Sequence, residues 1–279
     1  MTMQEELQVR VHGDAVKGTL VYLPGLHGDW TLVASFRAAL AGRTRFVEFT
    51  YPRTLDWSLD DYARGVLDAL NGQDIEEGWL LAESFGSQVA WAMLEVPQTR
   101  FRVLGVVLAG GFVRHPLPSL VQLCRAIVAG LPMSWLRPLL VLYAWYARFR
   151  HRHAPETLAD IGEFVARRTD LDRRAAAHRL RLIAEADWRP AAARTRLPVF
   201  YLSGLFDPIV PWPVVRRWLR RNCPGHRDSR VFVTSDHTVL SMVPAAAAAQ
   251  VLRWIREEAV RGTERPQILP RVNLTGSAL

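Results

Sequence analysis

A serine between small residues stands at the end of an apolar run in the first third of the chain. Ser84 lies in residues 82–86 (AESFG), directly after residues 78–81 (GWLL). On a sharp turn from a strand into a helix, small residues two positions before and after a serine let the two backbones approach closely, and the strained turn exposes the hydroxyl. Such a hydroxyl can act as a nucleophile. The pentapeptide is common by chance, so the prediction depends on partners elsewhere in the chain.

A nucleophilic serine needs a base that accepts its proton and an acid that orients this base. Asp207 follows the apolar residues 199–202, and His237 follows the apolar residues 231–233. In a parallel sheet the loops after the strands leave at one edge, so all three side chains are expected at the same edge. Serine, acid and histidine also follow one another in the order that accompanies this type of turn. Ser84, Asp207 and His237 are therefore the predicted catalytic triad.

Simpler interpretations exist for two members of this triad. His237 could be a loop histidine without a task, although the other histidines lie in early, inserted or connecting segments. Asp207 stands before a proline and could serve only to shape an Asx turn. Asp236 is the nearest competing acid, but a side chain adjacent to His237 does not easily reach back to the Nδ1 atom of that ring. The triad is favoured because order and position agree for all three residues.

The negative charge that develops when a nucleophile attacks a carbonyl needs hydrogen-bond donors that are already in place. One is predicted to be the backbone amide of Phe85, at the start of the helix after the serine. The other is predicted to be the amide of Leu26, in residues 23–28 (LPGLHG), where two glycines let the backbone approach a ligand. An ordinary glycine turn is the alternative for this loop. His27 is expected to pack within the loop, against Glu83.

These segments together resemble the α/β-hydrolase superfamily. Four segments carry the resemblance: the oxyanion loop at residues 23–28, with a proline where a histidine is frequent, and the triad segments at residues 82–86, 204–211 (GLFDPIVP) and 236–237. Ala82 and Asp236 each replace a frequent glycine, but neither departure removes a catalytic group. The resemblance covers residues 7–111 and 198–260 and implies a serine hydrolase with a lid at the usual position. A serine nucleophile argues against the dehalogenase and epoxide-hydrolase branches.

The elements that would position these residues alternate along the chain. Continuous apolar runs indicate buried strands, and segments with helical periodicity, such as residues 29–40 and 58–70, separate them. Predicted strands occupy residues 19–23, 46–49, 79–82, 103–109, 199–202 and 231–233, and residues 7–11 are expected as an antiparallel edge strand. This alternation predicts an α/β fold with a mostly parallel sheet and helices on both faces.

No strand pattern occurs from residue 112 to residue 190, where only helical patterns are found. We predict a core of residues 1–111 and 191–262, an all-helical lid insert of residues 112–190, and a loose tail of residues 263–279. Five apolar residues of the insert could line a channel for an acyl chain or an aromatic group, or could merely dock the insert on the core. They are Trp135, Leu139, Leu142, Tyr143 and Tyr146.

Arginine dominates the charge of the chain. There are 35 lysines and arginines against 27 aspartates and glutamates, a net charge of +8, and Lys17 is the only lysine. Without a zinc-finger spacing or a glycine-aromatic RNA motif, this indicates a compositional bias, and no nucleic-acid partner is predicted. The arginines at 148, 150 and 152 and those from 167 to 181 are expected to form a solvated face. Contact with an anionic head group or a membrane surface, as a peripheral contact, is the alternative.

Cys124 and Cys223 are too few and too far apart for a disulfide framework or a metal site, and neither a metal nor a cofactor is predicted. The first residues of the chain lack the basic and apolar regions of a signal peptide. The longest apolar run, residues 138–147, is too short to span a bilayer. A cytoplasmic location is therefore expected.

The sequence thus predicts a serine hydrolase that cleaves carboxylic esters or thioesters of a small molecule through an acyl-enzyme. Two alternatives stay open. The same fold could cleave another bond, such as an amide or an activated carbon–carbon bond, or it could bind a ligand without turnover. Neither the natural substrate nor the oligomeric state follows from the sequence.

Overall fold

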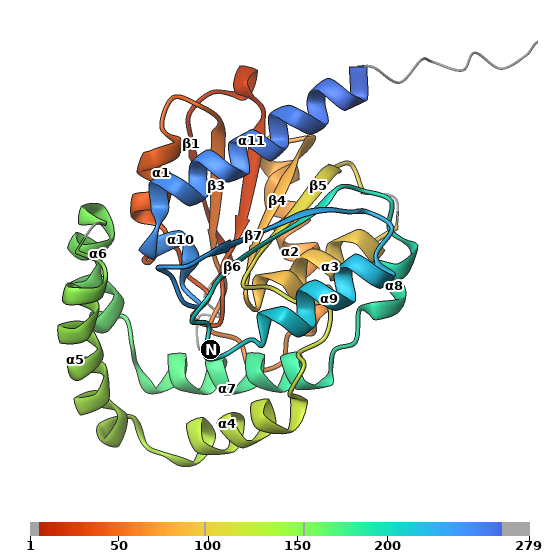
Figure 1. Ribbon diagram of the computed structural model, residues 1–279. Coiled ribbons are helices and arrows are strands. Elements are labelled where there is room, and N and C mark those ends of the chain that lie inside the picture. Colours follow the sequence, from red (N-terminus) through yellow and green to blue (C-terminus); the bar gives the residue numbers. More distant parts are fainter. Residues whose placement is uncertain (1–5, 98, 153, 264–279) are drawn as a thin grey trace, which may run out of the picture.

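A computed structural model describes residues 6–97, 99–152 and 154–263, and its centre is a seven-stranded sheet (Figure 1). The strand order is β1-β3-β2-β4-β5-β6-β7, and every neighbouring pair is parallel except β1 with β3. The strands are β1 (Gln8–His12), β2 (Thr19–Leu23), β3 (Arg45–Thr50), β4 (Glu77–Glu83), β5 (Arg102–Ala109), β6 (Val199–Gly204) and β7 (His226–Phe232). This confirms the predicted α/β fold class. The predicted tail lies, apart from residue 263, outside the described residues.

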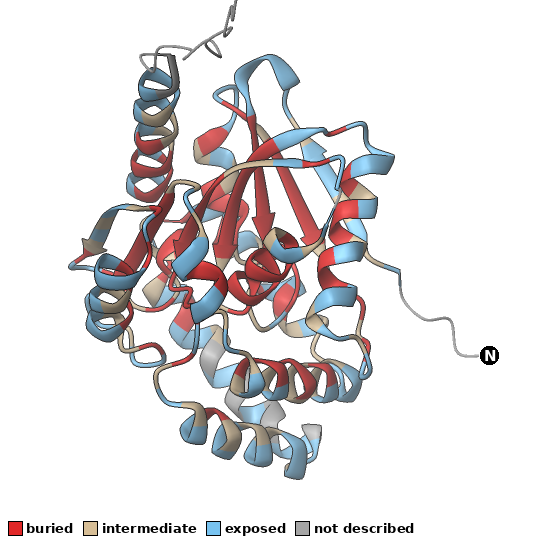
Figure 2. Cartoon of the chain, turned by 90° about the vertical axis from the view of Figure 1, so that its right-hand side faces the viewer, coloured by how far each residue is buried: buried red, intermediate tan, exposed pale blue. Residues whose placement is uncertain are grey.

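Helices cover both faces of the sheet (Figure 1). The first face packs against α1 (Ala34–Leu40), α10 (Val239–Met242) and α11 (Pro244–Thr263), and the second against α2 (Leu59–Gly72), α3 (Gly86–Glu95) and α9 (Trp212–Asn222). Successive side chains of a strand point to opposite faces, so Leu20 and Tyr22 of β2 join the first core while Val21 and Leu23 join the second. Every residue of β2 is buried, and the central strands are red in Figure 2. The continuous apolar runs therefore mark strands that are covered on both sides.

Two helices begin where the preceding residues cap them. The Ser58 hydroxyl accepts a hydrogen bond from the Asp61 amide, and the Asp61 carboxylate accepts one from the Ser58 amide, at the start of α2. Thr169 and Asp172 make the same reciprocal pair at the start of α7 (Asp170–Glu185). Such capping boxes satisfy amides that have no partner within the first turn, so they fix where the helix begins.

Two elements begin five residues away from their predicted starts. Helix α1 starts at Ala34 rather than at residue 29, because the Asp29 carboxylate accepts hydrogen bonds from the amide and the hydroxyl of Thr31 and holds a turn there. Strand β7 starts at His226 rather than at residue 231. It is an edge strand whose polar first residues pair with β6, so its apolar run marks only its end.

In the residues that the structure describes, the chain between β5 and β6 forms helices only. They are α4 (Pro118–Gly130), α5 (Met133–Arg150), α6 (Pro155–Ala166), α7 and α8 (Arg189–Arg194). Helices α4 and α7 pack on each other beyond the carboxyl ends of the parallel strands, and α5 and α6 pack on each other at the left side of the molecule (Figure 1). Helix α4, the lowest helix in both views, is largely exposed or half-buried (Figure 2). Across the same described ranges, no helix combines the length and the apolar character that crossing a membrane requires.

Candidate active site

Ser84 occupies a strained turn between β4 and α3. Its φ angle is 48°, in the left-handed region that residues other than glycine rarely adopt. The Ser84 amide donates to the Ala109 carbonyl at 3.0 Å, which ties the turn to the neighbouring strand β5. A Cβ atom at Gly86 would collide with the Leu23 carbonyl oxygen. The glycine two positions after the serine is therefore required by the close approach of α3 to β2.

The three residues of the predicted triad lie in one hydrogen-bonded row. His237 Nε2 is 2.9 Å from Ser84 Oγ, and His237 Nδ1 is 2.8 Å from Asp207 Oδ2. The Asp207 side chain is fully buried, and its other oxygen, Oδ1, accepts from the amides of Ile209 and Val210 at 2.9 Å each. Asp207 thus shapes its own loop, as in an Asx turn, and faces the histidine at the same time.

Two glycines make room for the histidine and its loop. Gly110 has a φ angle of 58°, and a Cβ atom there would lie 3.1 Å from both Nδ1 and Cε1 of His237. At Gly204, the last residue of β6, a Cβ atom would collide with the carbonyl of Asp236. Larger residues at either position would displace the ring from the row that it forms with the serine.

Asp236, the competing acid, is engaged with other groups. Its Oδ1 atom accepts from the amide and the hydroxyl of Thr238 at 2.9 Å each, and its Oδ2 atom pairs with Arg150 at the end of α5. The acid next to His237 therefore holds a helix of the segment between β5 and β6, while Asp207 holds the imidazole.

Burial and negative charge act in opposite directions on the His237 ring. Burial lowers the pKa of His237, because it disfavours the charged form. The hydrogen bond and the charge of Asp207 raise the pKa, with further contributions from Glu83 and Asp236. The net result is a pKa of His237 above its ordinary value of 6.5. A ring in this environment is a better proton acceptor than a free imidazole.

The loop that carries Leu26 lies against the serine turn. A Cβ atom at Gly25 would lie 3.5 Å from the Ser84 Cβ atom. In the part of the chain that the structure describes, neither the Leu26 amide nor the Phe85 amide donates a hydrogen bond to another residue. Both amides are thus available to a ligand, and their assignment to an oxyanion stays a prediction.

A buried arginine of α7 holds this loop in place. Nη1 of Arg179 donates to the carbonyls of Leu26 and His27, at 3.0 Å each. Nη2 donates to the carbonyl of Pro52 at 3.0 Å, and Nε donates to the hydroxyl of Tyr62 at 3.3 Å. One guanidinium group therefore joins the predicted oxyanion loop to α7 and to the chain after β3.

Arg179 was not among the predicted site residues, because the arginines from 167 to 181 were expected to form one solvated face. The buried residues of α7 are Ala175, His178, Arg179, Leu182 and Ile183. These positions follow helical spacing, so Arg179 lies on the buried stripe of the helix. An arginine on such a stripe is the signal that could have identified it. Gly28 accommodates it, because a Cβ atom at Gly28 would collide with the guanidinium.

The expected contact between His27 and Glu83 is replaced by two others. The His27 ring packs edge-on against Phe164 of α6, with the ring centroids 4.8 Å apart. Glu83 accepts a hydrogen bond from the hydroxyl of Tyr22, which lies on the adjacent strand β2.

The residues predicted to line a substrate channel all lie on α5. Trp135, Leu142 and Tyr146 are exposed, and the Tyr146 hydroxyl accepts a hydrogen bond from Arg150 at 2.9 Å. The side chains of Leu139 and Tyr143 lie outside the described ones. Contact of these residues with a substrate stays a prediction.

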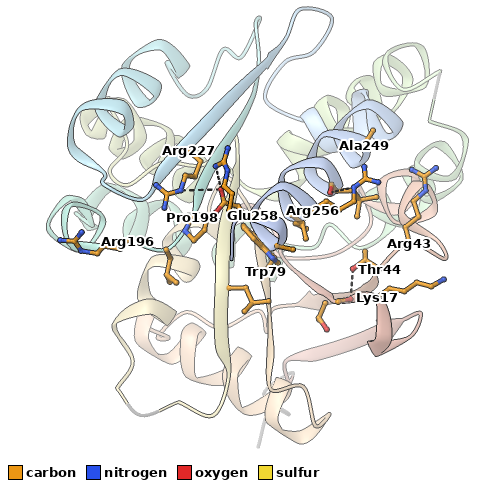
Figure 3. A pocket seen from close by; sticks show the side chains of 18 residues that line it. Lys17, Arg43, Thr44, Trp79, Arg196, Pro198, Arg227, Ala249, Arg256 and Glu258 are labelled. Carbon is orange, nitrogen blue, oxygen red and sulfur yellow. Dashed lines mark hydrogen bonds and ion pairs between the residues drawn. The ribbon is translucent and has the colours of Figure 1, made fainter. Parts of the chain in front are cut away.

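A large hollow, shown in Figure 3, lies at the amino ends of the parallel strands. Its volume is about 1370 Å³, and Thr19, Trp79 and Pro198, at the amino ends of three parallel strands, are among the residues that line it. Its cationic lining residues are Lys17, Arg43, Arg196, Arg227, Arg256 and Arg261. Because Ser84 follows the carboxyl end of β4, this hollow is separate from the candidate site.

The fold matches a known protein family. A family model described as "Alpha/beta hydrolase family" matches residues 20–261, and the chain belongs to that family. A comparison with curated protein sequences finds no match.

Solved structures share this fold at low sequence identity. A hydrolase from Pseudomonas aeruginosa is 17% identical with a TM-score of 0.71, over 89% of this chain and 94% of that one. A thermophilic esterase from Thermogutta terrifontis is 19% identical with a TM-score of 0.69, over 90% and 93% of the two chains. An enol-lactonase from Burkholderia xenovorans is 22% identical with a TM-score of 0.71, over 90% and 96%. At these identities the similarity concerns the fold.

Proposed function

We propose that this protein is a serine hydrolase that cleaves carboxylic esters or thioesters through an acyl-enzyme. The observation that carries the proposal is the row of Ser84, His237 and Asp207, joined by contacts of 2.9 and 2.8 Å. These separations are within the reach that proton transfer between a nucleophile and its base requires.

Each side chain has a distinct task in the proposed reaction. Ser84 Oγ attacks the substrate carbonyl while His237 Nε2 takes its proton. Asp207 keeps the Nδ1–H of the ring pointing toward its own carboxylate and stabilises the imidazolium that forms. His237 then gives the proton to the leaving alcohol or thiol. A water molecule, deprotonated by the same ring, attacks the acyl-enzyme. The ring then returns this proton to Ser84 Oγ as the carbon–Oγ bond breaks, which releases the acid and the free serine.

Two backbone amides are proposed to stabilise the negative charge of the tetrahedral intermediate by donating hydrogen bonds to its oxygen. The Phe85 amide follows the nucleophile, and the Leu26 amide comes from the loop that packs against the serine turn. Arg179 binds the Leu26 and His27 carbonyls, which holds that loop near the serine. Donors that are fixed before the reaction stabilise the transition state without reorganisation.

The ester class is supported by the names of structurally similar proteins, which include an esterase and an enol-lactonase. Cleavage of an amide or of an activated carbon–carbon bond, and ligand binding without turnover, are the competing functions.

A panel of substrates with the same acyl groups tests this proposal. p-Nitrophenyl esters and thioesters of increasing chain length are expected to be hydrolysed by the wild-type protein with multiple turnovers, much faster than the matching anilides. Product formation with anilides at equal or higher rates would indicate an amidase. The absence of ester turnover by a folded protein that binds the esters would support the ligand-binding alternative.

The pH dependence of the reaction should report the His237 environment. Only the neutral ring accepts a proton, so kcat/KM is expected to fall as the pH drops through the raised pKa of His237, with a midpoint above 6.5. Asp207→Asn removes the main group that raises this pKa, so the midpoint should move to lower pH while kcat falls by about 10⁴-fold. A wild-type midpoint below 6.5, or an unshifted midpoint in Asp207→Asn, would contradict the assignment.

A further inference from the structure

Helix α5 exposes a continuous stripe of large apolar side chains. Trp135, Leu142, Trp145 and Phe149 are 72%, 59%, 71% and 67% exposed. Together with the exposed Pro138, they follow one another at spacings of three and four residues, which places them on one face of the helix. Soluble proteins scatter exposed apolar residues singly, whereas contiguous groups mark interaction surfaces. We call the side chains of Trp135, Leu142, Trp145 and Phe149 the α5 stripe.

The side of α5 opposite the stripe faces the interior of the protein. Ala147 and His151, half a helical turn away from the stripe, are buried, and Arg150 pairs with Asp236 beside His237. The helix is therefore fixed by its inner face and its carboxyl end. The α5 stripe is thus not the side through which the helix joins the core.

The chain segment that contains the stripe carries charges of a single sign. No aspartate or glutamate occurs from residue 112 to residue 154, while arginine occurs at 114, 125, 137, 148, 150 and 152. Arg148 and Arg152 are exposed next to the stripe, and the Arg152 guanidinium lies 5.0 Å from the centre of the Phe149 ring. Tryptophan and phenylalanine beside arginine, without acids, is the composition of helices that lie in the interface of an anionic membrane.

Two other occupants fit these observations less well. In a symmetric pair of chains, the same face would meet itself, so that arginines would approach arginines without an acid from this segment to pair with them. A substrate channel would enclose its ligand and bury most of its lining, whereas three of the four stripe residues are about two-thirds exposed or more. An anionic phospholipid surface matches both the apolar stripe and the positive charge.

We propose that the α5 stripe docks this protein on an anionic phospholipid surface. The aromatic rings enter the boundary between head groups and acyl chains, and Arg148 and Arg152 contact lipid phosphates. The Arg150–Asp236 pair connects this helix to the loop of His237, so docking places the candidate site close to the lipid surface. The proposal concerns binding and does not depend on the hydrolytic function.

Co-sedimentation of the full chain with vesicles tests this inference. Binding to vesicles of phosphatidylcholine with phosphatidylglycerol is expected to exceed binding to phosphatidylcholine alone and to weaken as salt increases. Each arginine near an anionic surface increases the affinity for that surface about fivefold, so Arg148→Glu/Arg152→Glu should weaken vesicle binding by about 30-fold or more. Trp145→Ser/Phe149→Ser should weaken it to a similar extent while keeping the charge.

The matched control reverses the same number of charges at the other end of the molecule. Arg43→Glu/Arg196→Glu alters two exposed arginines of the hollow at the amino ends of the strands (Figure 3) and should leave vesicle binding within about twofold. An equal loss in this control would show that only net charge matters and would overturn the proposal. Equal binding to neutral and anionic vesicles, or no vesicle binding at all, would also overturn the proposal. The same holds if the protein forms a dimer that Trp145→Ser/Phe149→Ser abolishes while no vesicles are bound. Thermal unfolding and hydrolysis of a short soluble ester, measured on each variant, separate these outcomes from misfolding and from failure of the hydrolytic function.

Discussion

Replacing Ser84 with alanine is expected to lower kcat for an ester substrate by about five to six orders of magnitude. The Oγ atom is both the nucleophile of the proposed reaction and the partner of His237 Nε2 at 2.9 Å, so its loss removes the covalent step. The side chain makes no other described hydrogen bond, so thermal unfolding should change little. Steady-state kinetics with a p-nitrophenyl ester, together with a thermal melt, measure both effects.

The same experiment with His237→Ala distinguishes a cooperating pair from two independent contributors. If Ser84 and His237 act as one unit, the double variant should be no slower than either single variant. Ser119→Ala, which changes an exposed serine of α4, is the control and should retain wild-type kinetics. Losses that multiply in the double variant, or nearly full activity in Ser84→Ala, would show that the reaction proceeds through other groups.

Replacing Arg179 with methionine should lower both stability and catalysis. It leaves four acceptors without their donor: the carbonyls of Leu26, His27 and Pro52 and the hydroxyl of Tyr62. The free energy of unfolding is expected to fall by about 2–4 kcal/mol. Because the loop with the predicted Leu26 donor is released, kcat should fall by about 100-fold. Denaturant unfolding and steady-state kinetics measure the two effects.

The separate effects of Arg179→Met on kcat and on KM distinguish loss of loop positioning from a general loss of structure. An oxyanion contact exists only in the transition state, so kcat and kcat/KM should fall together with little change in KM. Arg179→Lys, which keeps one charged donor, should recover part of kcat. Arg174→Met, on the exposed side of the same helix, is the control and should behave as wild type. Reduced stability with an unchanged kcat would mean that Arg179 supports the fold alone.

The parts of the fold that follow local rules were predictable from the sequence. Strands covered on both sides appear as continuous apolar runs, which located β2 and β5 within a residue. The helical periodicity of residues 58–70 located helix α2 to within two residues at each end. The meeting of Ser84, Asp207 and His237 was expected because strand order and direction alone bring loops after parallel strands to one edge.

Side-chain contacts between residues that are far apart in the sequence were not predictable. Arg179 lies 153 residues after the Leu26 carbonyl that it binds, and no local pattern connects the two. The partner of Glu83 is Tyr22 because β2 and β4 are adjacent in the sheet, although α1, β3 and α2 separate them in the chain. The pair of Arg150 with Asp236 likewise depends on where α5 ends in space. The partners of long side chains depend on the tertiary structure, and no local sequence pattern indicates them.

Covalent labelling by a fluorophosphonate, followed by mass spectrometry of the intact protein, reports whether Ser84 is an activated nucleophile. We expect one adduct on the wild-type protein, none on Ser84→Ala, and labelling of His237→Ala slowed by about 100-fold or more, because the base that activates the serine is missing. Labelling that persists in Ser84→Ala, or that proceeds at the wild-type rate in His237→Ala, would contradict the claim that His237 activates Ser84 as a nucleophile.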